Sequence, residues 1–254
     1  MAAFTLIDAT RVNTDNEGFY ATNNQFQLSG PKGFIEVKVL ENNDIYVRVD
    51  LPGVPDDAIR YRVDGVRQKV VFFSGETPNE GGVREYSGTT GLGCDCCNIT
   101  EVDAKMKDGV LRMILSRVKV KDHETKCTLT LPPPFTGRSG QRVEDHPFVV
   151  RGRKGANYAE ARADGSIFLV LDMPGVGEGG EQVIHKEFEV KFRGQTKNVS
   201  EHDESGRFYM GKVGNAPEIA PSFLRHTVSS SIEAGVLKIL IAPPPRRSRS
   251  NTNA

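Results

Sequence analysis

The sequence predicts an all-β chain of two tandem antiparallel β-sandwiches, and two observations lead to this prediction. Two blocks of sequence recur in the same order, and hydrophobic residues within each copy alternate as they do in strands. No stretch carries a long helical stripe. The 254 residues suit one large or two small domains, and 37% hydrophobic residues together with 26 glycines are enough for a core.

The internal repeat is visible when residues 32–54 are aligned with residues 154–176, at an offset of 122 and without a gap. Both segments end in Asp-x-Pro-Gly-Val, where x is Leu in the first copy and Met in the second. A second block, Gly-Val-Leu-Arg-Met-Ile-Leu at 109–115, matches Gly-Val-Leu-Lys-Ile-Leu-Ile at 235–241. Two separated blocks in the same order and at similar spacing indicate a duplicated domain.

The alignment divides the chain into five parts. We expect an N-terminal arm over 1–31, a first domain over 32–120, a Pro-rich linker over 121–153, a second domain over 154–243 and a basic, disordered tail over 244–254. Proline triplets in the linker and at the start of the tail favour extended geometry. The linker is therefore expected to act as a spacer, and docking of a proline-binding module is the alternative.

The strand pattern is clearest at residues 45–51, where four apolar positions alternate with a tyrosine, an arginine and an aspartate. Such alternation predicts a half-buried strand with one solvent-exposed face. The following Pro-Gly ends the strand, because proline removes a ladder donor and glycine permits the turn. Similar runs at 66–74 and 110–118 predict further strands. Each copy therefore suits a sandwich of about 80 to 90 residues.

The second copy differs from the first on one strand face. Phe168 and Val170 stand where the first copy has Tyr46 and Arg48, so residues 167–173 are nearly apolar on both faces. Either another segment covers that face or it is exposed and adhesive. We expect cover from the linker or from the other copy, and a partner-protein surface is the alternative.

Charge and composition argue against several function classes. Lys and Arg number 33 and are balanced by 33 Asp and Glu, whereas nucleic-acid and membrane-surface binding need concentrated positive charge. No apolar run reaches the length of a membrane span, and the N-terminus lacks the features of a signal peptide. We therefore expect an intracellular protein, cytoplasmic or nuclear, that binds neither membrane nor nucleic acid directly.

Reactive residues form no recognisable catalytic or cofactor-binding motif. The five histidines are scattered, and the sequence has no P-loop, G-x-S-x-G, G-x-G-x-x-G or H-E-x-x-H motif. We expect no enzyme activity, no catalytic residues, no cofactor and no metal. Zinc binding and redox sensitivity stay open as alternatives to inert loop thiols for Cys94, Cys96, Cys97 and Cys127.

Two sequence blocks resemble an alpha-crystallin domain. Residues 50–54, followed by Val-Val-Phe-Phe-Ser-Gly-Glu at 70–76, are similar to the opening of that domain. Residues 102–111, Val-Asp-Ala-Lys-Met-Lys-Asp-Gly-Val-Leu, resemble its closing signature, and the cognate at 230–237 keeps Gly-Val-Leu but has serine in place of the alanine. The resemblance implies immunoglobulin-like sandwiches and the small heat-shock protein superfamily, whose members are ATP-independent holdases.

The same resemblance implies a protein-binding groove beside one strand of each domain, at about 99–106 and 226–232. Small heat-shock proteins dock there an Ile-x-Ile/Val tail from a neighbour, and they dimerise through strand exchange or edge pairing. Together with the apolar strand face of the second copy, the candidate protein-binding residues are Ile99, Val102, Ala104, Met106, Phe168, Val170, Val228 and Ile232.

The chain departs from that superfamily in three places. Residues 77–98 are rich in Gly and Thr, with no strand of the kind that relatives exchange between subunits, and the tail at 246–254 has no Ile-x-Ile/Val. In addition, two domains in one chain can meet each other's need for a binding partner internally. Tandem plant members, including the group named for increased DNA methylation, resemble it more nearly.

Two non-enzymatic functions therefore stay open. One is an ATP-independent, chaperone-like protein of the stress response that binds unfolding clients. The other is a dedicated scaffold in a nuclear chromatin-regulating complex that acts in anti-silencing or DNA demethylation. In both cases the expected partners are other proteins, with self-association as a further expectation.

Overall fold

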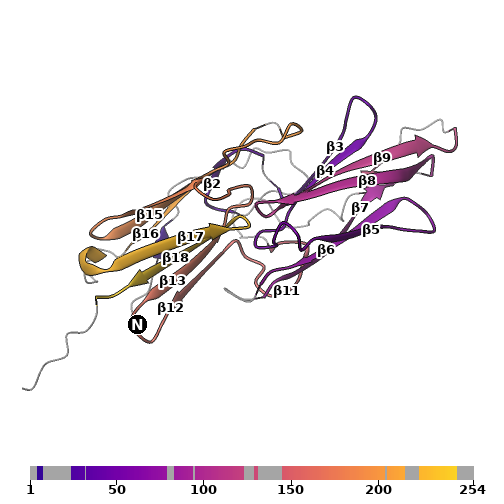
Figure 1. Ribbon diagram of the computed structural model, residues 1–254. Helices are drawn as coiled ribbons and strands as arrows, with labels where there is room; N and C mark the ends of the chain where they lie inside the picture. Colours follow the sequence, from indigo (N-terminus) through magenta and orange to yellow (C-terminus); the bar gives the residue numbers. More distant parts are fainter. Residues whose placement is uncertain are drawn as a thin grey trace, which may run out of the picture.

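The computed structural model describes the backbones of 5–7 and 129–130 and, with side chains, residues 24–31, 33–78, 83–93, 95–122, 145–203, 205–214 and 223–244. These residues form four antiparallel sheets that pack in pairs, as two β-sandwiches with separate hydrophobic cores (Figure 1). Within these ranges the one helix is η1 (Phe223–Arg225), a single 3-10 turn, which is far too short to cross a bilayer. The predicted all-β fold class is confirmed.

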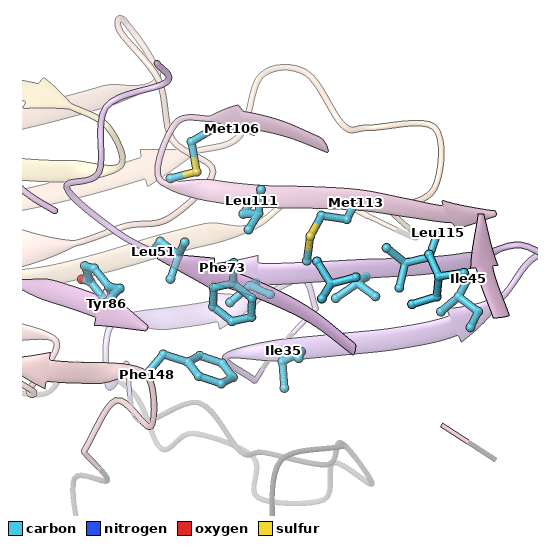
Figure 2. Close-up of a cluster of buried hydrophobic side chains, with 14 of the residues drawn as sticks. Ile35, Ile45, Leu51, Phe73, Tyr86, Met106, Leu111, Met113, Leu115 and Phe148 are labelled. Carbon is cyan, nitrogen blue, oxygen red and sulfur yellow. The ribbon is translucent and has the colours of Figure 1, made fainter. Parts of the chain in front are cut away.

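The first sandwich has a four-stranded sheet and a facing sheet. The four-stranded sheet contains, in order, β3 (Ile35–Val39), β4 (Ile45–Asp50), β9 (Val110–Lys119) and β8 (Cys97–Lys107). The facing sheet contains β5 (Arg60–Val63), β6 (Val70–Glu76) and β7 (Glu85–Leu92), with β10 (Leu129–Thr130) and β11 (Val149–Arg151) both paired with β7. Figure 2 shows the apolar core that these two sheets enclose.

The second sandwich repeats this arrangement. Its four-stranded sheet contains, in order, β12 (Asn157–Ala161), β13 (Ile167–Asp172), β18 (Val236–Ala242) and β17 (Thr227–Glu233). The facing sheet contains β14 (Glu181–His185), β15 (Glu189–Gln195) and β16 (Phe208–Gly214), with β1 (Thr5–Ile7) and β2 (Gln27–Ser29) both paired with β16.

The strand predicted from residue 66 begins later, at Val70. Residues 64–69 form the turn between β5 and β6, in which the Val66 N–H donates to the Asp64 carboxylate at 3.0 Å. Gln68 adopts a positive φ of 51°, which is incompatible with a strand. Apolar composition alone therefore predicted this strand too long at its start.

The two sandwiches exchange the segments that precede them in the chain. β2 precedes the first sandwich but pairs with β16 of the second, and β11 precedes the second sandwich but pairs with β7 of the first. In Figure 1 the indigo β2 accordingly lies beside the orange strands β15 and β16. Residues 145–151 were expected to belong to a spacer. They instead complete the first sandwich, because the whole segment crosses over to it.

Phe148 anchors the exchanged segment in the core of the first sandwich (Figure 2). Its ring packs edge-on against Phe73, with 5.2 Å between the ring centroids. Both rings lie over Gly88 of β7, where an added Cβ would stand 2.4 Å from Phe73 and 2.6 Å from Phe148. This close approach explains why β7 contains glycine. It also explains why the sequence gives little sign of this strand, since glycine weakens the strand signal. That 77–98 has no strand of the kind that relatives exchange between subunits stays a prediction.

Phe26 occupies the equivalent socket of the second sandwich. It packs edge-on against Phe192 at 5.1 Å between centroids, and a Cβ on Gly211 would lie 2.6 Å from the Phe26 ring. Phe26 and Phe148 are separated by 122 residues, which is the offset of the repeat. Each sandwich therefore needs an aromatic side chain that the other copy's flanking segment supplies.

Replacing Phe148 by alanine is expected to destabilise the fold by about 3 to 5 kcal/mol, because a buried ring is lost and a cavity remains. The matched control is Val150→Ala in the same strand, since Val150 is 63% exposed and its loss should change stability by less than about 0.5 kcal/mol. Urea unfolding followed by circular dichroism measures both. Equal, small effects of the two substitutions would contradict the role of Phe148 as an anchor.

Candidate functional site

The outer face of β4 is buried, so the prediction of a solvent-exposed face is wrong. Tyr46, Arg48 and Asp50 are only 1%, 0% and 5% exposed. A loop between β15 and β16 of the second sandwich covers this face. The Asp203 carboxylate of that loop accepts hydrogen bonds from the Tyr46 hydroxyl at 2.5 Å and from Arg112 at 2.7 and 3.1 Å. The face is therefore a contact surface between the sandwiches.

The pKa values of the groups at this contact shift so that Asp203 stays ionised and Tyr46 stays neutral, which stabilises the contact between the sandwiches. Burial of Asp203 opposes its ionisation, but hydrogen bonds from Arg112 and Tyr46 outweigh burial and lower the pKa of Asp203. Burial and the hydrogen bond to Asp203 raise the pKa of Tyr46, so its hydroxyl stays a donor. The loop is thus fixed by an ionised carboxylate against a cation and a neutral phenol.

Two buried ion pairs join the sandwiches, one in each direction. Asp50 at the end of β4 pairs with Arg207 of the second sandwich at 2.9 Å, and Asp172 at the end of β13 pairs with Arg84 of the first at 2.5 Å. All four side chains are at most 7% exposed. The two aspartates open the repeated Asp-x-Pro-Gly-Val motif. The motif therefore forms the junction between the sandwiches in addition to ending a strand.

A buried tyrosine near each arginine completes the network. The Arg84 Nη1 donates to the Tyr86 hydroxyl at 2.7 Å, and that hydroxyl donates to the Pro52 carbonyl at 2.8 Å. On the other side the Tyr209 hydroxyl donates to the Pro174 carbonyl at 2.9 Å. Burial raises the pKa of both tyrosines, which keeps them neutral donors. Burial alone lowers the pKa of Arg84, but the facing Asp172 carboxylate makes the net shift upward.

Main-chain hydrogen bonds also cross the junction in reciprocal pairs. The Gly53 N–H donates to the Ala234 carbonyl and the Gly175 N–H donates to the Asp108 carbonyl, each at 2.8 Å. Gly53 and Gly175 have φ values of 91° and 92°, a region that side chains with a Cβ rarely occupy. The glycine of each motif is thus required both for the turn and for contact with the other sandwich.

Each exchanged segment starts with a polar side chain that binds the other sandwich. His146 Nε2 lies 2.7 Å from the Asp50 carbonyl oxygen, and Asn24 Nδ2 donates to the Asp172 carbonyl at 2.5 Å. Burial lowers the pKa of His146 to about 4. The neutral ring accepts the Phe148 N–H at Nδ1, at 3.3 Å, and therefore donates through Nε2. His146 and Asn24 are again 122 residues apart.

The unpaired edge of β8 carries four of the candidate protein-binding residues, all turned toward the first core. Ile99 and Met106 are buried, whereas Val102 and Ala104 are half-buried and pack against the core from the side. The N-terminal end of β8 is bound by the turn before β6, where the Ile99 N–H donates to the Gln68 carbonyl at 2.7 Å. Beyond that point, no strand of the described chain pairs with the outer edge of β8.

The remaining four candidates lie in the second sandwich. Val228 and Ile232 are half-buried on β17, the edge strand equivalent to β8. On β13, Val170 is 3% exposed and lines a small pocket with Thr77 and Arg84 of the first sandwich. Phe168 is half-buried, and the Arg162 guanidinium lies 4.6 Å from its ring centroid. The expected cover from the other copy therefore reaches Val170, while Phe168 borders an open hollow.

The cysteine cluster is described only in part. Cys96 and Cys97 are buried, with their Sγ atoms 3.7 Å apart, whereas Cys94 and Cys127 lie outside the described residues. No three side chains of metal-binding type come together within the described ranges. The proline triplet of the linker and the tail over 246–254 also lie outside the described residues.

Residue-by-residue reasoning missed the junction residues other than the aspartates of the motif. Arg84 and Arg207 are 123 residues apart, and the pairs Asn24/His146 and Phe26/Phe148 follow the offset of 122. Extending the ungapped alignment to the N-terminal side of residues 32–54 would have found the last two pairs, whereas Arg84 and Arg207 align only across loops of different length. Asn and His share little chemistry beyond one donor and one acceptor, so their equivalence was not evident.

Removing one partner of a junction ion pair is expected to destabilise the fold strongly. Arg207→Met leaves the buried Asp50 carboxylate with only Arg48, 4.0 Å away, and we expect a loss of about 3 to 5 kcal/mol in the free energy of unfolding. Lys107→Ala removes an exposed ion pair with Asp56 and should cost less than about 1 kcal/mol. Chemical denaturation at neutral pH compares the two. A loss in Arg207→Met no larger than in the control would contradict the junction.

His146 should make the fold less stable in mildly acidic solution. Its folded-state pKa of about 4 lies below the unfolded value of about 6.5, so the unfolded chain takes up the proton first as pH falls. Stability from this group is complete above pH about 6.5 and declines, by on the order of 3 kcal/mol, toward pH about 4.

The variant His146→Asn isolates this effect, because asparagine already serves at the equivalent position 24 and does not titrate. The difference in unfolding free energy between the wild type and this variant is measured at several values between pH 7 and 4. As pH falls, the wild type should lose stability relative to the variant. A difference that stays constant with pH would show that His146 does not titrate as expected.

Comparisons with known proteins show to which family the chain is similar. A sequence family described as "Predicted plant small heat shock protein" matches residues 6–244. The chain is 42% identical over 109 residues to the "Putative 57 kDa heat shock protein" of Arabidopsis thaliana, which is 41% of this chain and 20% of that protein. It is 27% identical over 93 residues to the mitochondrial 23.6 kDa heat shock protein of the same plant, 33% of this chain and 43% of that protein.

A third relative, the 14.7 kDa heat shock protein of Arabidopsis thaliana, is 28% identical over 102 residues, which is 39% of this chain and 76% of that protein. The match thus spans a fifth of the length of the first relative and under half of the length of the second. The family match, in contrast, extends across both sandwiches and both exchanged segments. The chain therefore belongs to the plant small heat shock protein family.

Proposed function

We propose that this chain is an ATP-independent, non-enzymatic holdase that binds partly unfolded proteins along the edges of its four-stranded sheets. Membership in the small heat shock family supports a chaperone-like function at the level of the family. The observation that carries the finer proposal is the pair of edge strands β8 and β17, which present main-chain donors and acceptors beside half-buried apolar side chains. Such an edge binds an extended segment by strand addition, and apolar pockets select its side chains.

The exchanged segments occupy one edge of each facing sheet, and β8 and β17 remain among the unpaired edges. In the facing sheets, β10 and β11 pair with β7, and β1 and β2 pair with β16, so those edges are occupied within the chain. β8 is the longest strand described, with 11 residues, and it offers the longest run of unpaired backbone. The proposal needs no nucleotide, cofactor or metal, because strand addition and apolar burial supply the binding energy.

The scaffold function in a nuclear chromatin-regulating complex is the second candidate. The reciprocal junction favours it, because two sandwiches that satisfy each other suit a discrete subunit with dedicated partners. The relatives named above are heat shock proteins, which favours the holdase. A discrete monomer or dimer in light scattering that leaves clients unprotected would favour the scaffold.

The holdase proposal predicts that the purified chain suppresses aggregation of heated citrate synthase at an equimolar ratio, equally with and without ATP. Val102→Lys, and separately Val228→Lys, should lose at least half of the protection, because a charge interrupts the apolar row beside the edge. Val66→Lys is the matched control, since Val66 is 92% exposed in a turn and its variant should protect fully. Light scattering measures protection, and circular dichroism checks that each variant is folded. A folded wild type that gives no protection overturns the proposal.

A further inference from the structure

The second sandwich carries an open hollow on the outer face of β13 and β18. Phe168 and Leu240 are half-buried at its floor, and charged and hydroxyl side chains surround them. The hollow, called the Phe168 face below, is lined by Phe168, Leu240, Arg162, Lys238, Ser229 and Ser231. It lies on the flat side of the sheet and is distinct from the hydrogen-bonding edge of β17.

The first sandwich has the same face, and there it is occupied. Tyr46 and Ile114 are neighbours across β4 and β9 in the register in which Phe168 and Leu240 are neighbours across β13 and β18. Arg112 likewise occupies the position that Lys238 has in the second sandwich. The two faces thus share an aromatic ring, an aliphatic side chain and a cation in the same arrangement.

The occupant of the first face is a short acidic loop. Asp203 binds Arg112 and the Tyr46 hydroxyl, and the His202 ring lies 5.3 Å from the Tyr46 ring, centroid to centroid. Lys38 at the edge of the sheet donates to the His202 carbonyl. A carboxylate on the central cation and a ring on the aromatic floor are therefore the chemistry that this face binds within the molecule itself.

The loop that corresponds to the occupant is shorter in the first sandwich. It runs over residues 77–84, between β6 and β7, whereas the occupant loop runs over 196–207, between β15 and β16. Thr77 and Arg84, at the two ends of the shorter loop, line a pocket with Val170. Val170 lies one step along β13 from the Phe168 side chain on the same face.

We propose that the Phe168 face docks an acidic segment of a partner protein, in the manner in which the Asp203 loop docks on the first sandwich. A carboxylate of the partner is placed against Lys238 and Arg162, and an aromatic or aliphatic side chain packs on Phe168 and Leu240. The serine hydroxyls of β17 supply hydrogen bonds to its backbone. Opposite charge speeds the encounter, while burial of the ring and aliphatic side chain supplies most of the affinity.

Glu160 gives the docked segment a direction. It lies opposite Phe168 on β12, at the position that Lys38 has opposite Tyr46 in the first sandwich. An acidic segment is therefore repelled around Glu160, so its carboxylates lie toward Lys238 of β18 and toward Arg162, beyond the end of β12. Glu160→Lys recreates the arrangement of the occupied face and should strengthen binding.

The test uses the full-length chain and a ten-residue peptide that copies its own loop, residues 197–206. The control peptide has lysine at the positions of Glu201, Asp203 and Glu204. In amide NMR titrations, the acidic peptide should bind saturably and shift amides of β13, β17 and β18, whereas the lysine peptide should not. No saturable shift at millimolar peptide, equal binding of both peptides, or shifts confined to another surface would each overturn the proposal.

Two charge variants of exposed residues make the test specific. Arg162→Glu should weaken binding of the acidic peptide at least fivefold, and Glu160→Lys should strengthen it severalfold. Arg67→Glu, in the exposed turn before β6, is the matched control and should leave binding unchanged. Unchanged affinity in both face variants would overturn the assignment of the site.

Light scattering tests the remaining alternative, in which a second copy of the chain covers the Phe168 face. If the chain forms a dimer that Arg162→Glu dissociates, a second copy covers the face and the proposal of an acidic partner segment is wrong. Failure of peptide binding in a chain that still suppresses client aggregation overturns this inference and leaves the holdase proposal standing. The two proposals therefore fail independently.

Discussion

The aspartates of the repeated Asp-x-Pro-Gly-Val motif are buried where their strands end, and each is paired with an arginine of the other sandwich. Asp50 also lies 4.0 Å from Arg48, and Asp172 also binds Arg153 at 2.9 Å. Each carboxylate is thus buried beside two arginines, one of which the other sandwich supplies, and removal of that cation is destabilising. The same turn places its glycine N–H against a hairpin of the opposite sandwich. The tyrosine network and the polar side chains of the exchanged segments assemble around these two pairs. The two sandwiches therefore act as one structural unit.

Exchange of flanking segments determines which surfaces are free for binding. Phe26 and Phe148 insert into sockets over glycine, and their strands occupy the edges of β7 and β16. Among the described strands, β8 and β17 are the longest that remain at an edge, beside the shorter edge strands β3, β5, β12 and β14. The interaction that stabilises the pair thus also places the unpaired edges, on which the proposed client binding depends.

The two sandwiches differ most on the outer faces of their four-stranded sheets. The first face carries Tyr46 and Arg48 and is covered by the Asp203 loop, whereas Phe168 and Val170 leave the second face apolar and partly open. A polar face can be buried only when its groups are paired, and here Asp203 of the loop pairs with Tyr46 while Glu36 of β3 pairs with Arg48. An apolar floor with cations at its rim can instead stay available for a second, acidic partner.

The sequence by itself determined several strands and the turn at each Asp-x-Pro-Gly-Val, because alternation and turn chemistry are local. The positions of the edge strands β8 and β17 followed from the resemblance to the alpha-crystallin domain. Tertiary structure alone decided that Tyr46 and Asp50 are buried, since their partners Asp203 and Arg207 lie 157 residues away in the chain. It also decided that residues 145–151 complete a sheet, and that β7 is a strand despite its glycines. Each of these features depends on a surface supplied by the other sandwich, which local patterns do not encode.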